Sequence, residues 1–236
     1  MEKRGQLTIF IIIAIVVVAG AIILFSFYNP LKSQNPEVDA VYSFVENCIK
    51  TSGGEVILKI GEGGGYFFPP ELSTDEGITY YYSDGKTNFP LKENIENEIA
   101  YYVNKKLSFC VGEFENFPEL NISQGQIESS AKILDDKVVL EVKYPLSVQA
   151  EEGVVIPEDF EVEIPIRFGV VYDSAKSFVE DSKESVCLSC AADLIDANNL
   201  KIDMMYDNSS NTIFVFKDEE SQVNNETFIL VFANKY

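Results

Sequence analysis

The feature that most constrains this chain is an apolar run without a charged side chain, which follows a short basic leader. The run extends over residues 7–28 (LTIFIIIAIVVVAGAIILFSFY). At ~1.5 Å per residue, a helix of this length is about 33 Å long, enough to cross a hydrocarbon core of ~30 Å. A core helix of a soluble domain would normally carry a polar face, which this run lacks. The sequence therefore predicts a transmembrane or filament-core helix over residues 6–28.

Lys3 and Arg4 precede the run and set its expected orientation. Under the positive-inside rule they stay in the cytoplasm and the rest of the chain lies outside the cell, although Lys32 is a weaker opposing signal. A cleaved secretory signal has an apolar core of only ~7–15 residues and small residues at its exit. The exit here is FSFY (residues 25–28), and its aromatic side chains disfavour cleavage at that point.

The leader Lys3-Arg4-Gly5-Gln6, directly before an Ile/Val-rich run, resembles the class III signal peptide of archaeal type IV pilins and archaellins. In that family a prepilin-type peptidase cuts on the cytoplasmic side, before the apolar run. The resemblance covers residues 1–28 and implies a cut between Gly5 and Gln6. The mature chain would keep its apolar helix, which would pack with copies of itself in a filament core or hold the protein in the membrane.

Two features depart from the family's pattern. Bacterial pilins place a Glu at the fifth mature position, which is Phe10 here, although archaeal members often lack that Glu. Pro30 and Pro36 would interrupt the long continuous helix of many pilins, because proline breaks helical hydrogen bonding. An uncleaved signal anchor that keeps Met1 is therefore the alternative interpretation of the same segment.

Composition limits what the exterior region can do. The chain has 38 acidic and 18 basic side chains, a formal charge of -20 and no His. This charge repels nucleic-acid phosphates and favours a soluble, self-repelling surface. Without His, imidazole bases, Ser-His-Asp triads and His-ligated metals are excluded. An apolar fraction of 46% indicates a folded region, and its length is sufficient for a buried core.

The first part of the exterior region predicts two helices and a strand. Residues 35–37 (NPE) form a helix start with an N-cap, a first-turn proline and an early acid, and Gly53 and Gly54 are predicted to end that helix. A short apolar piece follows over 56–60. Pro90 is predicted to open a second helix, and the tyrosine run that precedes it predicts a strand. The apolar stripe of the second helix comprises Leu91, Ile95, Ile99, Tyr102, Val103 and Leu107.

The second part changes to the period of a strand. Residues 138–144 and 160–168 alternate apolar and polar side chains, which is typical of half-buried antiparallel strands, and Pro165 indicates an edge position. A turn at 135–136 would join two strands of a hairpin. Helices mixed with strand pairs, without regular alternation, predict the α+β class. The other expected elements are strands over 127–134, 137–148, 201–206, 212–217 and 227–233, and helices over 170–184 and 191–200.

Four cysteines are the strongest candidates for chemistry. Outside the membrane an even count favours disulfides, and four cysteines allow three pairings. Because Cys48 and Cys110 each lie at the end of a predicted helix, Cys48–Cys110 with Cys187–Cys190 is the favoured pairing. Two alternatives stay open. A helix that starts at Cys187-Leu-Ser-Cys190 could form a thioredoxin-like redox site, and four thiolates could bind zinc, although one Cys-x-x-Cys pair matches zinc-site spacing poorly.

Other motifs give weaker signals. Asn121, Asn208 and Asn225 begin Asn-x-Ser/Thr sequons and are candidate glycosylation acceptors. The glycine-rich run over 61–65 lacks the Gly-Lys-Ser/Thr of a phosphate-binding loop and predicts a turn. The acidic run over 218–220 lacks the spacing of a calcium loop, so we expect a solvated surface.

The sequence therefore predicts a non-enzymatic, outward-facing structural or interaction protein without a metal or cofactor. It would be a single-pass membrane protein or a subunit of an extracellular filament. Its expected partners are the membrane, other copies of its apolar helix and a prepilin-type peptidase, but no nucleic acid. An uncleaved, signal-anchored envelope or binding protein is the alternative, and a thiol redox or metal module at Cys187 and Cys190 is less favoured. The expected divisions are a basic leader (1–5), an apolar helix (6–28), a linker (29–36) and an extracytoplasmic α+β domain (37–236), which could divide into 37–120 and 121–236.

Overall fold

The computed structural model describes residues 36–150, 153–155, 159–207 and 211–236. The predicted leader, apolar helix and nearly all of the linker lie outside the described residues. The chain divides into two units, Met1–Ala40 and Val41–Tyr236. The helices and sheets below belong to the second unit, apart from the first residues of the first helix.

Two long helices form the first half of the described chain. Helix α2 (Pro36–Glu62) begins at the predicted proline, and α3 (Lys92–Val111) begins two residues after Pro90. The ring of Tyr42 on α2 stacks on Phe160 with 4.6 Å between ring centroids. Helix α3 buries an apolar stripe at the predicted helical spacing, although two residues predicted for that stripe differ: Leu91, the N-cap, is exposed, and Tyr102 is half-buried. The buried residues of α3 are Ile95, Ile99, Val103, Leu107 and Val111.

The prediction that Gly53 and Gly54 end the first helix is wrong. Helix α2 runs through both and includes the apolar piece over 56–60, whose apolar side chains are buried. The glycines permit close packing: a Cβ on Gly53 would lie 2.4 Å from Leu140 Cδ1, and one on Gly54 would lie 2.3 Å from Val223 Cγ1. Glycine costs about 1 kcal/mol relative to alanine inside a helix. Close approach to the strands outweighs that local preference.

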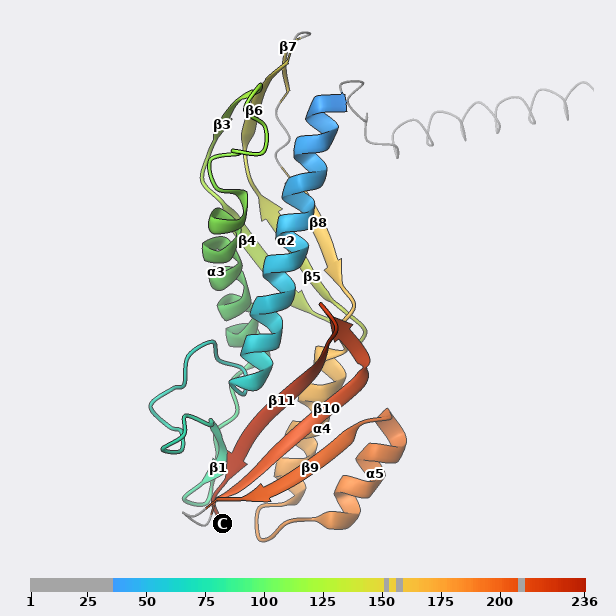
Figure 1. Cartoon of the computed structure of the whole chain (residues 1–236). Helices are drawn as coiled ribbons and strands as arrows, with labels where there is room; N and C mark the ends of the chain where they lie inside the picture. The colour runs from blue at the N-terminus through green and yellow to red at the C-terminus, as the bar shows by residue number, and fades with distance from the viewer. Residues whose placement is uncertain (1–35, 151–152, 156–158, 208–210) are drawn as a thin grey trace, which may run out of the picture. The chain divides into compact units, whose positions relative to one another are not determined.

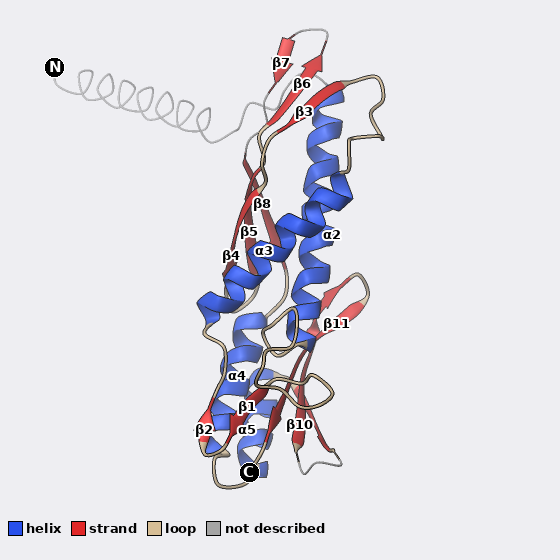
Figure 2. Ribbon diagram, turned by 90° about the vertical axis from the view of Figure 1, so that its left-hand side faces the viewer, coloured by secondary structure: helices blue, strands red, loops and turns tan. Residues whose placement is uncertain are grey.

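Two small antiparallel sheets follow α3 in the described chain. One has the order β3-β6-β7 and the other the order β4-β5-β8. Helix α3 lies against β4, as Figure 2 shows. Their strands are β3 (Asn121–Gln124), β4 (Glu128–Ile133), β5 (Val138–Lys143), β6 (Leu146–Ala150), β7 (Gly153–Val155) and β8 (Asp159–Ile164).

Proline residues mark the limits of these strands. The single strand expected over 137–148 divides at Pro145 into β5 and β6, which belong to different sheets, because proline cannot donate a hydrogen bond to a ladder. Pro165 directly follows β8, which is an edge strand as predicted. The predicted hairpin turn at 135–136 is present, and the Leu134 N–H donates to the Lys137 carbonyl at 2.9 Å.

The chain ends in a five-stranded sheet of order β2-β1-β11-β10-β9 (Figure 1). The β1 and β11 strands pair in parallel and the other neighbours pair antiparallel. Helix α4 packs on β10 and β11, and α5 packs on α4 and β9. The elements are β1 (Tyr80–Ser83), β2 (Lys86–Thr87), α4 (Phe168–Asp181), α5 (Leu188–Asn198), β9 (Lys201–Tyr206), β10 (Thr212–Val223) and β11 (Glu226–Asn234).

An aromatic cluster forms the core under this sheet. Phe178 of α4 lies 4.9 Å from Phe214 and 5.7 Å from Phe216 between ring centroids. Phe232 of β11 lies 5.4 Å from each of the same two rings, and all four residues are buried. Phe178 comes from α4 and the other three rings come from β10 and β11, so the helix and the sheet share one aromatic core.

The described residues thus form a mixed α+β fold, which confirms the predicted class. Among the helices that the structure describes, none combines the length and the apolar character needed to cross a bilayer. The predicted transmembrane or filament-core helix at 6–28 lies outside the described residues.

Candidate functional site

The structure joins the four cysteines in two disulfides, with the pairing that the sequence favours. Cys48 on α2 bonds to Cys110 on α3 across 62 residues of chain, with 5.7 Å between the Cα atoms. Cys187 bonds to Cys190, three positions later in the chain, with 5.3 Å between the Cα atoms. No cysteine is left as a free thiol.

The two bonds differ in their surroundings. Cys48 is 1% exposed and lies in the core, while its partner Cys110 is exposed at the end of α3. Cys187 and Cys190 are both half-buried, and the two residues between them, Leu188 and Ser189, are exposed. The first bond therefore ties two helices together, and the second closes a short loop at the protein surface.

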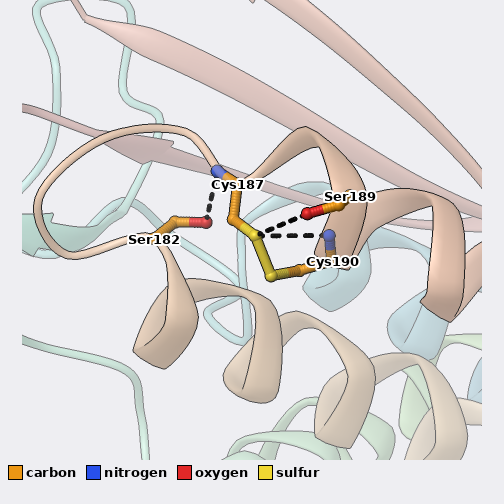
Figure 3. Close-up of a disulfide and its surroundings, with 4 residues drawn as sticks. All are labelled: Ser182, Cys187, Ser189 and Cys190. Carbon is orange, nitrogen blue, oxygen red and sulfur yellow. Dashed lines mark hydrogen bonds between the residues drawn. A yellow bond between two sulfur atoms is a disulfide. The ribbon is translucent and has the colours of Figure 1, made fainter.

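Cys187 stands at the start of α5 and caps it (Figure 3). Its Sγ atom accepts a hydrogen bond from the Cys190 N–H at 3.2 Å, and the Ser189 hydroxyl lies 3.5 Å from the same sulfur. The first N–H groups of a helix lack intrahelical partners, so a cap at this position satisfies one of them. Sulfur here takes the place that a serine or aspartate oxygen usually occupies.

Ser182 supports this loop from the neighbouring helix. It caps the end of α4, is fully buried, and its Oγ accepts a hydrogen bond from the Cys187 N–H at 3.2 Å (Figure 3). Sequence reasoning did not single out Ser182, because nothing in its spacing from Cys187 distinguishes it from other serines. The chain thus holds the backbone of Cys187 independently of the disulfide.

An exposed apolar surface lies on β9, which follows α5. Met204 is 37% exposed and Tyr206 is 70% exposed on the same face of this outermost strand, and the Tyr206 hydroxyl donates to the Met204 sulfur at 3.8 Å. Tyr236 lies between this surface and the cysteine loop. Burial raises the pKa of the Tyr236 hydroxyl. Hydrogen bonds with Asn234 and Ser182 lower that pKa, and the nearby Tyr206 raises it further. Tyr206 and the residue that supports Cys187 therefore both lie near Tyr236.

The acidic run over 218–220 is not wholly solvated surface, which corrects the expectation. Asp218 is fully buried, and its carboxylate accepts two hydrogen bonds from Arg167, each at 3.0 Å. Arg167 also donates to Glu220 at 2.7 Å and to the Asn198 carbonyl at the end of α5 at 2.7 Å. A buried carboxylate is costly unless it is paired, and Arg167 supplies the pair. This network is structural, because it ties α5 to the sheet.

The sequons fall on different parts of the fold. Asn121 is exposed on β3 and donates to Gln149 Oε1 at 2.8 Å. Asn225 is exposed in the turn between β10 and β11, where its φ is 65°. Asn208 lies outside the described residues. Two of the three candidate acceptors are therefore open to solvent.

The remaining predicted site residues belong to the N-terminal leader and its first apolar-run boundary. Lys3, Arg4, Gly5 and Gln6 lie outside the described residues. In the part of the chain that the structure describes, no group of three or more His, Cys, Asp or Glu side chains could hold a metal ion. The described site that brings reactive side chains together is the Cys187–Cys190 loop.

Comparison with known proteins adds no relative. The chain matches no protein-family model, no curated protein and no solved structure.

Proposed function

We infer that this chain is a membrane-anchored, outward-facing structural or interaction protein, and that it is a pilin-like subunit of a cell-surface filament. The observation that carries this proposal is the pairing of all four cysteines in disulfides. Structural disulfides persist in oxidising compartments outside the cytoplasm. An α+β region that bears two of them, placed after an uncharged run, fits a protein whose bulk lies outside the cell.

The leader supports the narrower part of the proposal. Lys3 and Arg4 keep the N-terminus in the cytoplasm, and Gly5-Gln6 supplies the cut. After processing, the apolar helix would begin at Gln6 and would pack with copies of itself. The acidic α+β region would then form the outer surface of the filament, where a formal charge of -20 on the whole chain favours solubility.

The mature N-terminus tests the filament proposal. Mass spectrometry of the protein from its native membrane should find a chain that begins at Gln6. Gly5→Val should leave the leader in place, because a peptidase must approach the backbone closely at the cut, whereas Glu2→Gln should be processed normally. A mature protein that still carries residues 1–5 would overturn the pilin-like proposal and favour the uncleaved anchor.

Topology tests the broader proposal separately. Protease added to intact cells should digest the region from α2 onward, while a cytoplasmic control protein stays whole. Electron microscopy tests the filament proposal again: cells that lack this protein should lack a surface filament that cells with the protein carry. If the region stays intact while a known surface protein is digested, the outward orientation is wrong.

A further inference from the structure

The Cys187–Cys190 loop has properties that a purely structural cross-link does not need. The two cysteines are separated by only three positions, so the bond joins residues that the first turn of α5 already holds together. Ala191 N–H donates to the Cys187 carbonyl at 3.1 Å, and Cys187 N–H donates to buried Ser182. The helix start is therefore hydrogen-bonded on both sides of Cys187 without the disulfide.

The same hydrogen bonds would stabilise a thiolate at Cys187 after reduction. The Cys190 N–H and the Ser189 hydroxyl both reach Cys187 Sγ in the oxidised protein. Charge-assisted hydrogen bonds are stronger than neutral ones, and the positive end of a helix favours a negative charge at its first residues. Cysteines in this setting gain thiolate character and react as nucleophiles and as leaving groups. Cys190 lies about one helical turn after Cys187, and its backbone N–H is one of the two donors to Cys187 Sγ.

The surroundings of the loop offer an apolar surface to a polypeptide. Leu188, within the loop, is 68% exposed, and Tyr206, on the outermost strand, is 70% exposed. Met204, on the same face of β9, is 37% exposed, and its sulfur lies 3.8 Å from the Tyr206 hydroxyl. Methionine and aromatic side chains at a surface adapt to varied apolar partners. A reduced, incompletely folded polypeptide exposes such side chains together with its thiols.

We propose that Cys187 and Cys190 form a thiol–disulfide exchange site, whose oxidised form accepts two electrons from a polypeptide that carries two thiols. This goes beyond the proposed structural role, does not depend on how the N-terminus is processed, and departs from the expectation that the chain is not an enzyme. The Cys48–Cys110 bond remains a structural cross-link, because Cys48 is buried in the core.

The exchange has two steps. First, a thiolate of the partner attacks Cys187 Sγ, forms a mixed disulfide and expels the Cys190 thiolate, which takes up a proton. Second, the partner's other thiol loses its proton to water. The resulting thiolate attacks the partner's first sulfur, which is bonded to Cys187 Sγ, and forms the partner's disulfide. Cys187 leaves in this second step as the thiolate that the hydrogen bonds at the helix start stabilise. The partner's two thiols are oxidised and the Cys187–Cys190 bond is reduced.

Reduction of the full-length protein by graded dithiothreitol tests the site without any substitution. Alkylation and mass spectrometry would report each bond separately. We expect the Cys187–Cys190 bond to open at a dithiothreitol concentration about tenfold or more below that for Cys48–Cys110, while circular dichroism stays native. If Cys187–Cys190 opens only together with unfolding, the proposal is wrong.

Two matched variants test the role of each cysteine. Cys190→Ser leaves Cys187 as a free thiol, and Cys187→Ser leaves Cys190. With iodoacetamide at pH 6, we expect Cys187 to be alkylated about tenfold faster than Cys190, with a lower pH midpoint. Equal rates would overturn the assigned roles.

A peptide substrate tests the partner. A reduced two-cysteine peptide with flanking Phe and Tyr residues should be oxidised faster than the same peptide with Ser and Asn in their place. Tyr206→Ser should reduce the preference for the aromatic peptide over the polar one. Equal rates for the two peptides would overturn the proposed polypeptide surface.

Discussion

The two disulfides place covalent bonds in contrasting parts of the fold. Cys48–Cys110 closes a long stretch of chain and joins α2 to α3 at a buried cysteine, whereas Cys187–Cys190 closes one helical turn at the surface. In the chain-entropy treatment the stabilisation grows with loop length, to about 4 kcal/mol for the first bond and about 2 kcal/mol for the second. The first bond therefore suits stability, and the second is free to serve chemistry.

The C-terminal region is held by a different means. There α5 has no buried residue, and its last turn is tied to β10 through the Arg167 side chain and the fully buried Asp218 carboxylate. Buried hydrogen-bonded charge replaces a long-range covalent bond in this region. The contrast predicts that each region fails in its own way when its tie is removed.

The largest effect should come from Cys110→Ser. Because this residue is exposed, the substitution removes the long-loop cross-link without opening a cavity, and the free energy of unfolding should fall by about 4 kcal/mol. Denaturant unfolding of the full-length protein in mild detergent measures the change. Ser108→Ala on the same helix is the control and should change it by less than about 0.5 kcal/mol. If Cys110→Ser lowers the free energy of unfolding no more than removal of the Cys187–Cys190 bond does, the two disulfides do not differ in their contribution to stability.

The next effect should come from Arg167→Met. It leaves the Asp218 carboxylate buried with the Ser221 hydroxyl and a backbone N–H as its remaining partners, so the free energy of unfolding should fall by about 3 kcal/mol. Lys201→Met, which breaks the exposed pair with Glu219, is the matched control and should cost less than about 1 kcal/mol. Equal losses in these variants would show that burial of Asp218 does not decide the stability of this region.

Removal of the short disulfide should have a smaller and local effect. The double variant Cys187→Ser with Cys190→Ser should lower the free energy of unfolding by about 2 kcal/mol or less. Hydrogen exchange should quicken at the amides of α5 and stay unchanged in α2 and α3. Faster exchange throughout α3 would contradict the local role of this bond.

The smallest effect should come from Gly53→Ala within α2. A new Cβ must displace Leu140 and Ile164, which costs ~1–3 kcal/mol, while the gain in helix propensity returns about 1 kcal/mol. A net loss of about 1 kcal/mol is expected from denaturant unfolding. Lys50→Ala, at an exposed position of the same helix, should be neutral or stabilising. A Gly53→Ala protein more stable than the wild type would show that the two side chains repack freely.

Several elements were predictable because their signal is local. The buried stripe of α3 follows from helical spacing, and β9 over 201–206 follows from its apolar character between polar turns. The mixed α+β class follows from the same patterns. The candidate cysteine site was also visible, because Cys-x-x-Cys is a local motif.

Other features were not predictable, because tertiary contacts decide them. Two consecutive glycines normally end a helix, yet contacts with Leu140 and Val223 carry α2 past them. An acidic run normally faces solvent, yet Arg167 draws Asp218 into the interior. Ser182 supports Cys187 only because the end of α4 and the start of α5 meet in space.

By itself, then, the sequence determined the mixed class, the periodic faces of its elements, the acidic character and the presence of an uncharged run behind a basic leader. Each depends on residue type and on spacings of a few positions, which act through the backbone nearby. The tertiary structure alone decided where α2 ends, which carboxylate is buried and what supports the Cys187 loop. The first two depend on contacts between residues tens of positions apart, where packing and desolvation outweigh local preference. The third depends on how the short connection between α4 and α5 brings Ser182 to the Cys187 N–H.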